Sequence, residues 1–328
     1  MLPSKDRKIN FTDNLNQPRR MATLPDFLII GAGKSGTTSL DFYLKQHPQV
    51  FMPELKEPNF FAYEAHSVSD FNDQETIKHY QQSITVFDEY KNLFIGAQAG
   101  QVLGEVSNTT MYMPHAIESI QKYLKNPKII AILRNPAERL VSRFMHLERV
   151  NKVPKTTLED VFNKESIWWK RADLVNEGMY YKHLSKFYSS FNNNNIHVIL
   201  YQDLKQDVKK VLHEICEFLE IDTSYQFDTS VVYNKSGKVK NKAIQNLIGD
   251  NSKVINALKA AVPLVHSSLK RNKFLHSAVQ KLRNKNLEKP NIDIAFKAKI
   301  INQIYDSDIK ALEGLLNRDL SSWYQFNE

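Results

Sequence analysis

Short apolar runs alternate along the chain with longer segments in which apolar residues recur at helical spacing. Runs rich in strand-forming residues predict buried strands at 27–30, 50–52, 102–107, 128–133 and 196–201. Helical spacing predicts helices near 37–47, 70–92, 113–125, 136–147, 157–191 and 203–220. Strands that alternate with helices are typical of α/β proteins. The pattern therefore predicts a central, mostly parallel sheet with helices on both faces.

The two ends of the chain depart from this alternation. Residues 1–24 are polar and charged, so we expect a flexible arm that is neither a signal peptide nor a membrane anchor. Residues 242–328 are predicted to be largely helical, with a break near Lys289–Pro290. The expected organisation is therefore an arm at 1–24 and an α/β domain at 25–328. No apolar run approaches the roughly 20 residues that a membrane-spanning helix needs.

A glycine-rich turn follows the first predicted strand. It reads Gly31-Ala-Gly-Lys-Ser-Gly-Thr-Thr38, and a predicted helix begins in it, with Thr37 and Thr38 as possible caps. Glycines allow the backbone to approach a ligand, and a helix N-terminus offers free N–H groups and the positive end of the helix dipole. A lysine and three hydroxyl groups add further donors. The turn predicts an anion site made of Gly33, Lys34, Ser35, Gly36, Thr37 and Thr38.

The glycine pattern alone leaves the bound nucleotide open. An ATP-type loop, Gly-x-x-x-x-Gly-Lys-Ser/Thr, would need glycine at position 28, which is Leu28. The dinucleotide pattern Gly-x-Gly-x-x-Gly does match, at Gly31, Gly33 and Gly36. It also calls for an acidic residue at the end of a second strand. The candidates, Glu54 and Glu57, lie between prolines that favour a loop.

A second anion site is predicted where the strand at 128–133 ends. Arg134 follows this strand directly, Pro136 suits an early helical position, and Ser142 lies two helical turns further on. An arginine and a serine hydroxyl suit a terminal phosphate, although an arginine paired with a carboxylate explains the position equally well. Arg139 and Arg143 lie on the polar face of the same helix, where solvated charges and ligand contacts are both consistent with the pattern.

These two segments resemble the nucleotide site of sulfotransferases. The first is similar to the family's 5′-phosphosulfate loop, and Arg134-x-Pro-x-x-Arg-x-x-Ser142 is similar to its 3′-phosphate site, with 100 residues between Lys34 and Arg134. The resemblance implies a single-domain sulfotransferase fold with a P-loop-like phosphosulfate-binding loop.

Other segments resemble the bacterial and heparan-sulfate-type carbohydrate branch of this family. Lys56-Glu-Pro-Asn-Phe-Phe61 is similar to a Lys-Glu-x-x-Phe-Phe segment whose glutamate is the catalytic base. Residues 104–107 with Tyr112 resemble the strand and turn that line the acceptor cleft, and 234–241 resemble a late basic loop over the nucleotide. Two positions depart from the branch, because Val106 stands where a lysine is common and Asn59 where some members have a histidine.

The resemblance implies a donor, a product and roles for named residues. The donor would be 3′-phosphoadenosine 5′-phosphosulfate (PAPS) and the product 3′-phosphoadenosine 5′-phosphate (PAP), with no metal. Glu57 would be the general base and Lys34 the cation on the leaving oxygen, with backbone N–H groups from Gly33 to Thr38 on the phosphosulfate. The 3′-phosphate would be held by Arg134 and Ser142, with help from Lys238 or Lys240.

The composition indicates a general class of ligand but does not identify one. The net charge of +8 suggests anionic ligands, although scattered solvated lysines also explain it. The expected acceptor is a glycan, a glycolipid or a small alcohol, and no nucleic acid is expected. The single cysteine, Cys216, is predicted to be a buried core residue, which gives no sign of an oxidising compartment and favours a cytoplasmic location. Oligomeric state stays open.

Two other functions remain compatible with the sequence. An ATP-dependent small-molecule kinase would need Mg²⁺ and a carboxylate to hold it, and we find no clear candidate. A non-catalytic polyanion-binding protein would bind with strong salt dependence and would be indifferent to the loss of Lys34. Two separate sites, each suited to one phosphate end, argue against both.

Overall fold

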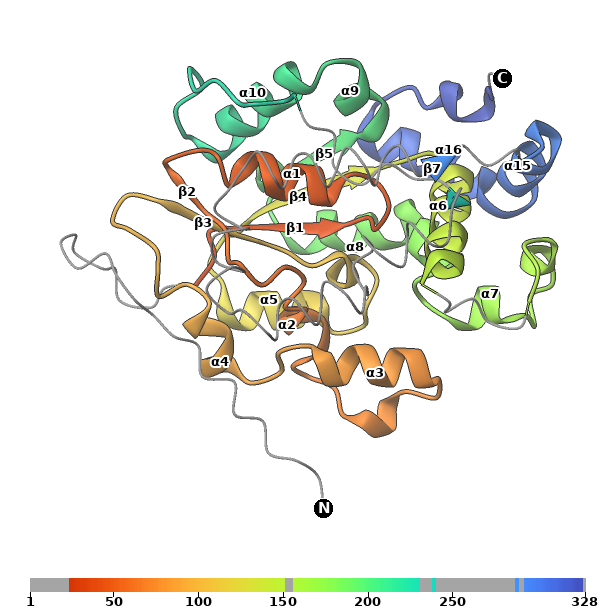
Figure 1. The fold of residues 1–328 in the computed structure, drawn as a ribbon, viewed down its shortest axis with the longest axis horizontal. Coiled ribbons are helices and arrows are strands. Elements are labelled where there is room, and N and C mark those ends of the chain that lie inside the picture. Colours follow the sequence, from red (N-terminus) through yellow and green to blue (C-terminus); the bar gives the residue numbers. More distant parts are fainter. Residues whose placement is uncertain (1–23, 151–155, 231–237, 240–286, 289–291, 327–328) are drawn as a thin grey trace.

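The computed structural model describes residues 24–150, 156–230, 238–239, 287–288 and 292–326 (Figure 1). The predicted arm lies outside these residues except for Leu24, and so does most of the region from 242 to 291. No helix among the described residues is both long enough and apolar enough to cross a membrane.

A parallel sheet lies at the centre of the fold. Its five strands are arranged in the order β2-β3-β1-β4-β5, and every neighbouring pair is parallel. The strands are β1 (Phe27–Gly31), β2 (Val50–Phe51), β3 (Val102–Val106), β4 (Lys128–Leu133) and β5 (Ile196–Leu200). A separate antiparallel pair joins β6 (Lys238–Val239) to β7 (Leu287–Glu288). The predicted α/β class and parallel sheet are confirmed.

Helices cover both faces of the sheet. Successive strand residues point to opposite faces, and apolar strand residues are buried on both. Phe27 and Ile29 belong to a core that includes residues of α1 (Thr37–Leu44) and α10 (Val208–Leu219). Leu28 and Ile30 belong to the opposite core, which packs on α5 (Ala116–Tyr123), α6 (Pro136–Arg149), α8 (Tyr180–Ser190) and α16 (Asp306–Leu316). Figure 1 shows α1 and α10 on one side of β1 and α5 on the other. Cys216 is buried in the first core, as predicted.

The other helices lie at the periphery of the sheet. They are α2 (Phe60–Tyr63), α3 (Gln74–Gln82), α4 (Phe87–Asn92), α7 (Ile167–Lys170), α9 (Tyr201–Gln206) and α15 (Ile294–Ile300). A π-helical turn, Ile301–Tyr305, joins α15 to α16.

The region predicted as helical with interruptions at 157–191 contains α7, α8 and short 3-10 turns. Two further predicted helices are each divided in two. The helix predicted at 70–92 is α3 and α4, because Ser83 is extended and the Ile84 N–H donates to the Pro58 carbonyl at 2.9 Å. The helix predicted at 203–220 is α9 and α10. Asp207 begins α10 by accepting a hydrogen bond from the Lys210 N–H at 3.0 Å. Hydrophobic spacing continues across both breaks, so periodicity alone could not locate them.

Because the strands are parallel, their carboxyl ends meet at one edge of the sheet. The glycine-rich loop follows β1, Ser107 follows β3, and Arg134 follows β4. Three segments that are far apart in sequence therefore reach the same edge, which in Figure 1 faces α6.

The tight contact between β1 and β3 gives a test of the packing. Gly104 lies beside Phe27 in register, and a Cβ at Gly104 would lie 2.0 Å from the Phe27 ring. We expect Gly104→Ala to lower the free energy of unfolding by about 1–3 kcal/mol or more through overpacking. The matched variant Gly314→Ala, in α16 with nothing within 4 Å of the new Cβ, should gain about 0.5–1 kcal/mol. Urea unfolding measures both, and equal effects would contradict the packing described.

Candidate active site

The loop between β1 and α1 is held tightly against the sheet. The Ala32 N–H donates to the Ile132 carbonyl at 2.8 Å, and Ser35 is fully buried. Gly36, with a φ of 107°, precedes α1, and a Cβ there would crowd Ile132, Tyr201 and Leu204 at 3.2–3.3 Å. Only glycine fits this position, since the left-handed conformation and the close neighbours both disfavour a side chain.

Gly36, rather than a threonine, is the residue at the N-terminus of α1, and no side chain caps the helix. The prediction that Thr37 or Thr38 caps it is therefore wrong. Among the described residues, the N–H groups of Gly36, Thr37 and Thr38 have no hydrogen-bond acceptor. These three donors begin an eight-residue helix, which is the arrangement that favours anion binding.

Lys34 lies within this loop among other cations. Its φ is 68°, an uncommon conformation for a residue with a side chain. Burial, together with the positive charges of Arg149, Arg143, Arg134 and Lys56, lowers the pKa of Lys34 to about 7. Among the described residues, the charges that act most strongly on the pKa of Lys34 are those of four cations. Such a cluster is stabilised by an anion, because each positive charge otherwise repels the others.

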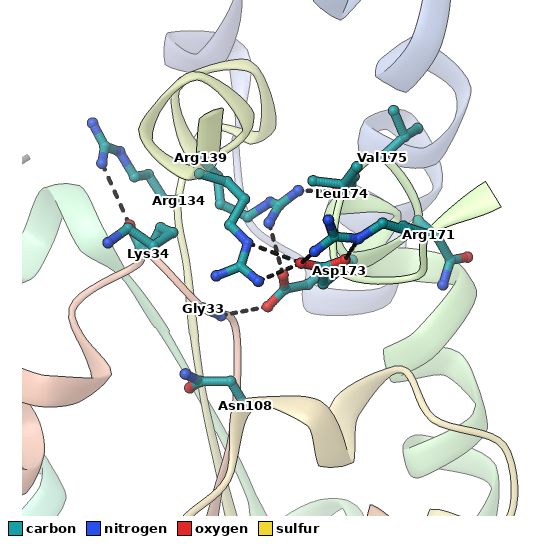
Figure 2. Close-up of polar contacts among 12 residues, drawn as sticks. Gly33, Lys34, Asn108, Arg134, Arg139, Arg171, Asp173, Leu174 and Val175 are labelled. Carbon is teal, nitrogen blue, oxygen red and sulfur yellow. Dashed lines mark hydrogen bonds and ion pairs between the residues drawn. The ribbon is translucent and has the colours of Figure 1, made fainter. Parts of the chain in front are cut away.

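Arg134 joins the second predicted anion site to the loop. Its guanidinium pairs with Glu138 at 2.9 Å. It also donates to the Lys34 carbonyl at 3.4 Å, a contact drawn in Figure 2. It also lies over the Tyr201 ring. Ser142, further along α6, is buried. The carboxylate pairing that the sequence left open is therefore present, and Arg134 contacts the loop as well.

A cap fixes the start of α6. The side-chain oxygen of Asn135 accepts from the N–H groups of Ala137 and Glu138 at 3.0 and 3.2 Å, and Pro136 occupies the first turn. The side-chain amide of Asn135 donates to the Trp323 carbonyl at 2.7 Å. The C-terminal segment thus supports the helix that carries Ser142.

Glu57 lies close to the loop, 19 residues after Thr38 in sequence. Its carboxylate accepts from Asn108 Nδ2 at 2.7 Å and from Lys56 Nζ at 3.3 Å. The same Lys56 ammonium donates to Thr38 Oγ1 at 2.8 Å. Glu57 is in the left-handed region with a φ of 57°, and its side chain is 33% exposed. The carboxylate is oriented by two donors and remains open to solvent.

A buried carboxylate on β3 supports the backbone around Glu57. Glu105 accepts from Ser107 Oγ at 2.9 Å, and Ser107 Oγ accepts from the Asn59 N–H at 3.0 Å. Asn59 in turn donates to the Glu57 carbonyl at 2.8 Å. Burial raises the pKa of Glu105 to about 8. A charged residue in an otherwise apolar strand was a signal that the sequence offered for this group.

A histidine from α3 lies beside Asn59. His79 Nε2 is 3.4 Å from Asn59 Nδ2, and His79 Nδ1 is 3.0 Å from the Tyr63 hydroxyl. Asn59 occupies the position where some relatives were expected to carry a histidine. An imidazole from a different part of the chain is therefore present next to it, and no sequence pattern pointed to it.

Two arginines of α6 are held by carboxylates. Arg139 is fully buried and pairs with Glu177 at 2.8 Å, while Arg143 pairs with Asp173, which also accepts from Arg171 at 2.8 Å. Figure 2 shows Arg139, Arg171 and Asp173 grouped on one side of the loop. Of the two alternatives that the sequence left open for Arg139, a solvated charge is excluded by its burial. Its partners lie 30 residues or more away, so spacing within α6 could not reveal them.

Two predicted ligands are not settled by the described residues. Lys240 lies outside them, and only the backbone of Lys238 is described, in β6, which contacts α6. Their part in nucleotide binding stays a prediction. Within the described part of the chain, no three His, Cys, Asp or Glu side chains are grouped as metal ligands would be.

The fold and this edge of the sheet define a class of protein. A glycine-rich loop, a cluster of cations and an oriented carboxylate at the carboxyl end of a parallel sheet are typical of enzymes that transfer a group from an anionic nucleotide. A family model of the sulfotransferase domain matches residues 24–292. The chain belongs to the sulfotransferase family.

Curated relatives agree with this family. The chain is 27% identical over 219 residues to the bifunctional heparan sulfate N-deacetylase/N-sulfotransferase 1 of Caenorhabditis elegans, covering 65% of this chain and 24% of the relative. It is 24% identical to human carbohydrate sulfotransferase 15, covering 62% of this chain and 45% of the relative. The chain thus spans between about a quarter and a half of the length of these relatives.

One solved structure supports the fold assignment. A sulfotransferase from Alicyclobacillus acidocaldarius superposes with a TM-score of 0.61 at 25% identity, covering 92% of this chain and all of that one.

The crowding of Lys34 predicts an unusual titration. We expect the Lys34 ammonium to lose its proton near pH 7, and a bound polyanion such as PAP to raise this pKa. Binding then takes up a proton between the two pKa values, so affinity should fall as pH rises above 7. Calorimetry in buffers of different ionisation enthalpy measures this uptake. The proton uptake should be absent in Lys34→Arg, and uptake that persists there would assign it to another group.

Proposed function

We propose that the protein transfers a sulfuryl group from PAPS to a hydroxyl or amine of a carbohydrate or glycoconjugate acceptor. Membership of the family supports the reaction class. The observation that carries the assignment of residues is the position of Lys56, whose ammonium contacts Thr38 of the loop at 2.8 Å and Glu57 at 3.3 Å. This contact joins the proposed phosphosulfate loop to the proposed base.

Glu57 acts as the general base in this proposal. Its carboxylate removes the proton from the acceptor hydroxyl or amine as that atom bonds to sulfur. Asn108 and Lys56 hold the carboxylate, and the residue's partial exposure gives an acceptor access to it. The reaction resembles phosphoryl transfer, in which positioning and charge stabilisation do most of the work.

The loop and Lys34 stabilise the leaving group. As the acceptor attacks, the bond between sulfur and the bridging oxygen breaks, and that oxygen leaves on PAP with a negative charge. The ammonium of Lys34 and the N–H groups of Gly36, Thr37 and Thr38, which have no acceptor in the described part of the chain, are suited to this charge. Arg134 and Ser142 hold the 3′-phosphate.

The proposed acceptor class comes from relatives and from the site together. Relatives named as heparan sulfate and carbohydrate sulfotransferases support a glycan. The region next to Glu57 also carries the partly exposed imidazole of His79, a polar group that suits a hydroxylated ligand.

Donor binding gives the first test. Lys34→Ala and Arg134→Ala should each weaken PAP binding about tenfold to a hundredfold, because each removes a charge-assisted contact to a phosphate. Calorimetry on wild type and both variants measures this effect, with ATP plus Mg²⁺ as the competing ligand. Lys210→Ala, an exposed charge on α10, should bind like wild type.

Two outcomes would contradict the proposed donor. Equal or tighter binding of ATP plus Mg²⁺ would favour a kinase. PAP affinity that falls as much in Lys210→Ala as in Lys34→Ala would indicate a general polyanion attraction instead.

The base assignment is tested separately. Glu57→Gln keeps a side-chain oxygen that can accept the hydrogen bond from Asn108, but this oxygen cannot act as a base. We therefore expect the rate of sulfuryl transfer to fall by about 10²- to 10⁴-fold. PAP affinity should change little. Glu64→Gln, whose carboxylate accepts from Lys122 and from the Tyr123 hydroxyl, serves as the matched control. A Glu57→Gln enzyme with an unchanged rate would remove Glu57 from this role.

A further inference from the structure

One buried carboxylate connects the two proposed halves of the donor site. Glu177 Oε1 accepts from the Gly33 N–H at 2.6 Å, and Glu177 Oε2 accepts from Arg139 Nη1 at 2.8 Å. Gly33 belongs to the loop, and Arg139 belongs to α6, between Arg134 and Ser142. Glu177 and Arg139 are both buried. The dashed contact at Gly33 and the position of Arg139 can be followed in Figure 2.

The absence of a side chain at Gly33 leaves room for this carboxylate. A Cβ at Gly33 would lie 2.8 Å from Glu177 Oε1, so the carboxylate packs directly against the loop backbone. The Gly33 N–H, predicted to hold the phosphosulfate, is instead directed at Glu177 in this structure. The loop therefore uses one of its donors to fix its own position.

The segment that carries Glu177 is itself held on both sides. The Glu177 N–H donates to the Ala172 carbonyl at 3.0 Å. On the other side, a Cβ at Gly178 would lie 2.9 Å from the Tyr305 ring, and the Tyr305 hydroxyl donates to the Val175 carbonyl at 3.1 Å. The backbone that carries the carboxylate is thus held in place, and the two carboxylate oxygens fix the loop and α6 relative to each other.

We propose that Glu177 is a positioning residue that sets the spacing between the loop and α6, and so couples the two phosphate-binding halves of the donor site. This inference rests on the proposed function, because it takes the loop and α6 to bind the two ends of one bisphosphate nucleotide. A ligand that bridges two sites gains affinity from the second contact only where their spacing matches the ligand. Loosening the spacing lowers that gain without removing either site.

The quantity that tests this role is a ratio of affinities. PAP carries both phosphates, whereas adenosine 5′-monophosphate lacks the 3′-phosphate. The dissociation constant of adenosine 5′-monophosphate divided by that of PAP therefore reports the gain from bridging. We expect Glu177→Gln to lower this ratio about tenfold, a typical size for coupling between sites. Binding of adenosine 5′-monophosphate itself should change much less. Calorimetry on the full chain, with the weak ligand measured by competition, gives both constants.

A matched control separates positioning from general loss of stability. Asp308 is also buried and accepts from the N–H groups of Tyr181 and Lys182, four and five residues after Glu177 in sequence, at 2.9 and 3.0 Å. Asp308→Asn should lower the melting temperature and leave the ratio unchanged. If Glu177→Gln fails to fold because Arg139 is left unpaired, the double variant Glu177→Leu with Arg139→Met removes both charges and should show the same lowered ratio.

The outcomes are distinct. A ratio that is unchanged in Glu177→Gln, or that falls equally in Asp308→Asn, overturns the positioning role alone. Tighter PAP binding by Glu177→Gln also overturns it, because Glu177 would then compete with the nucleotide for the loop. A wild-type protein with no preference for PAP over adenosine 5′-monophosphate overturns the proposed function, and the positioning role falls with it.

Discussion

The candidate site depends on positive charges that gather around one buried lysine. Burial of Lys34, together with the charges of Arg149, Arg143, Arg134 and Lys56, lowers its pKa to about 7. Some of these cations have carboxylate partners, as Arg134 has Glu138 and Arg143 has Asp173. For Lys34, the strongest charge effects from described residues come from cations. A polyanionic ligand with charge at more than one end removes this repulsion, which makes the site selective for such ligands before any base or sugar is recognised.

The parallel sheet brings these charges together. Because all five strands run the same way, the residues that follow β1, β3 and β4 emerge at one edge. Lys34 follows β1, Asn108 follows β3 and Arg134 follows β4. The segment with Glu57 joins them through the hydrogen bond from the Glu57 N–H to the Val106 carbonyl at 2.9 Å. An antiparallel arrangement would have sent neighbouring strand ends to opposite edges.

Sequence reasoning worked where the signal was local. The strands, the glycine loop, Arg134 after β4 and proline in the first turn of α6 all depend on neighbouring residues, and the structure has them close to the predicted positions. It failed where a partner came from far away in the chain. Spacing alone left Arg139 as a solvated charge or a ligand contact, whereas it is buried and paired with Glu177, 38 residues later. The break after α3 likewise depends on Ile84 bonding to Pro58, which hydrophobic periodicity does not report.

Two carboxylates near the proposed reaction centre lie in opposite environments. Glu57 is partly exposed and accepts hydrogen bonds from Asn108 and Lys56. Glu105 is buried on β3, and burial raises its pKa to about 8, so it is largely neutral at pH 7. A second negative charge beside Glu57 would repel the anionic donor. Keeping Glu105 protonated lets it support the backbone of Glu57 through Ser107 and Asn59 without adding that charge.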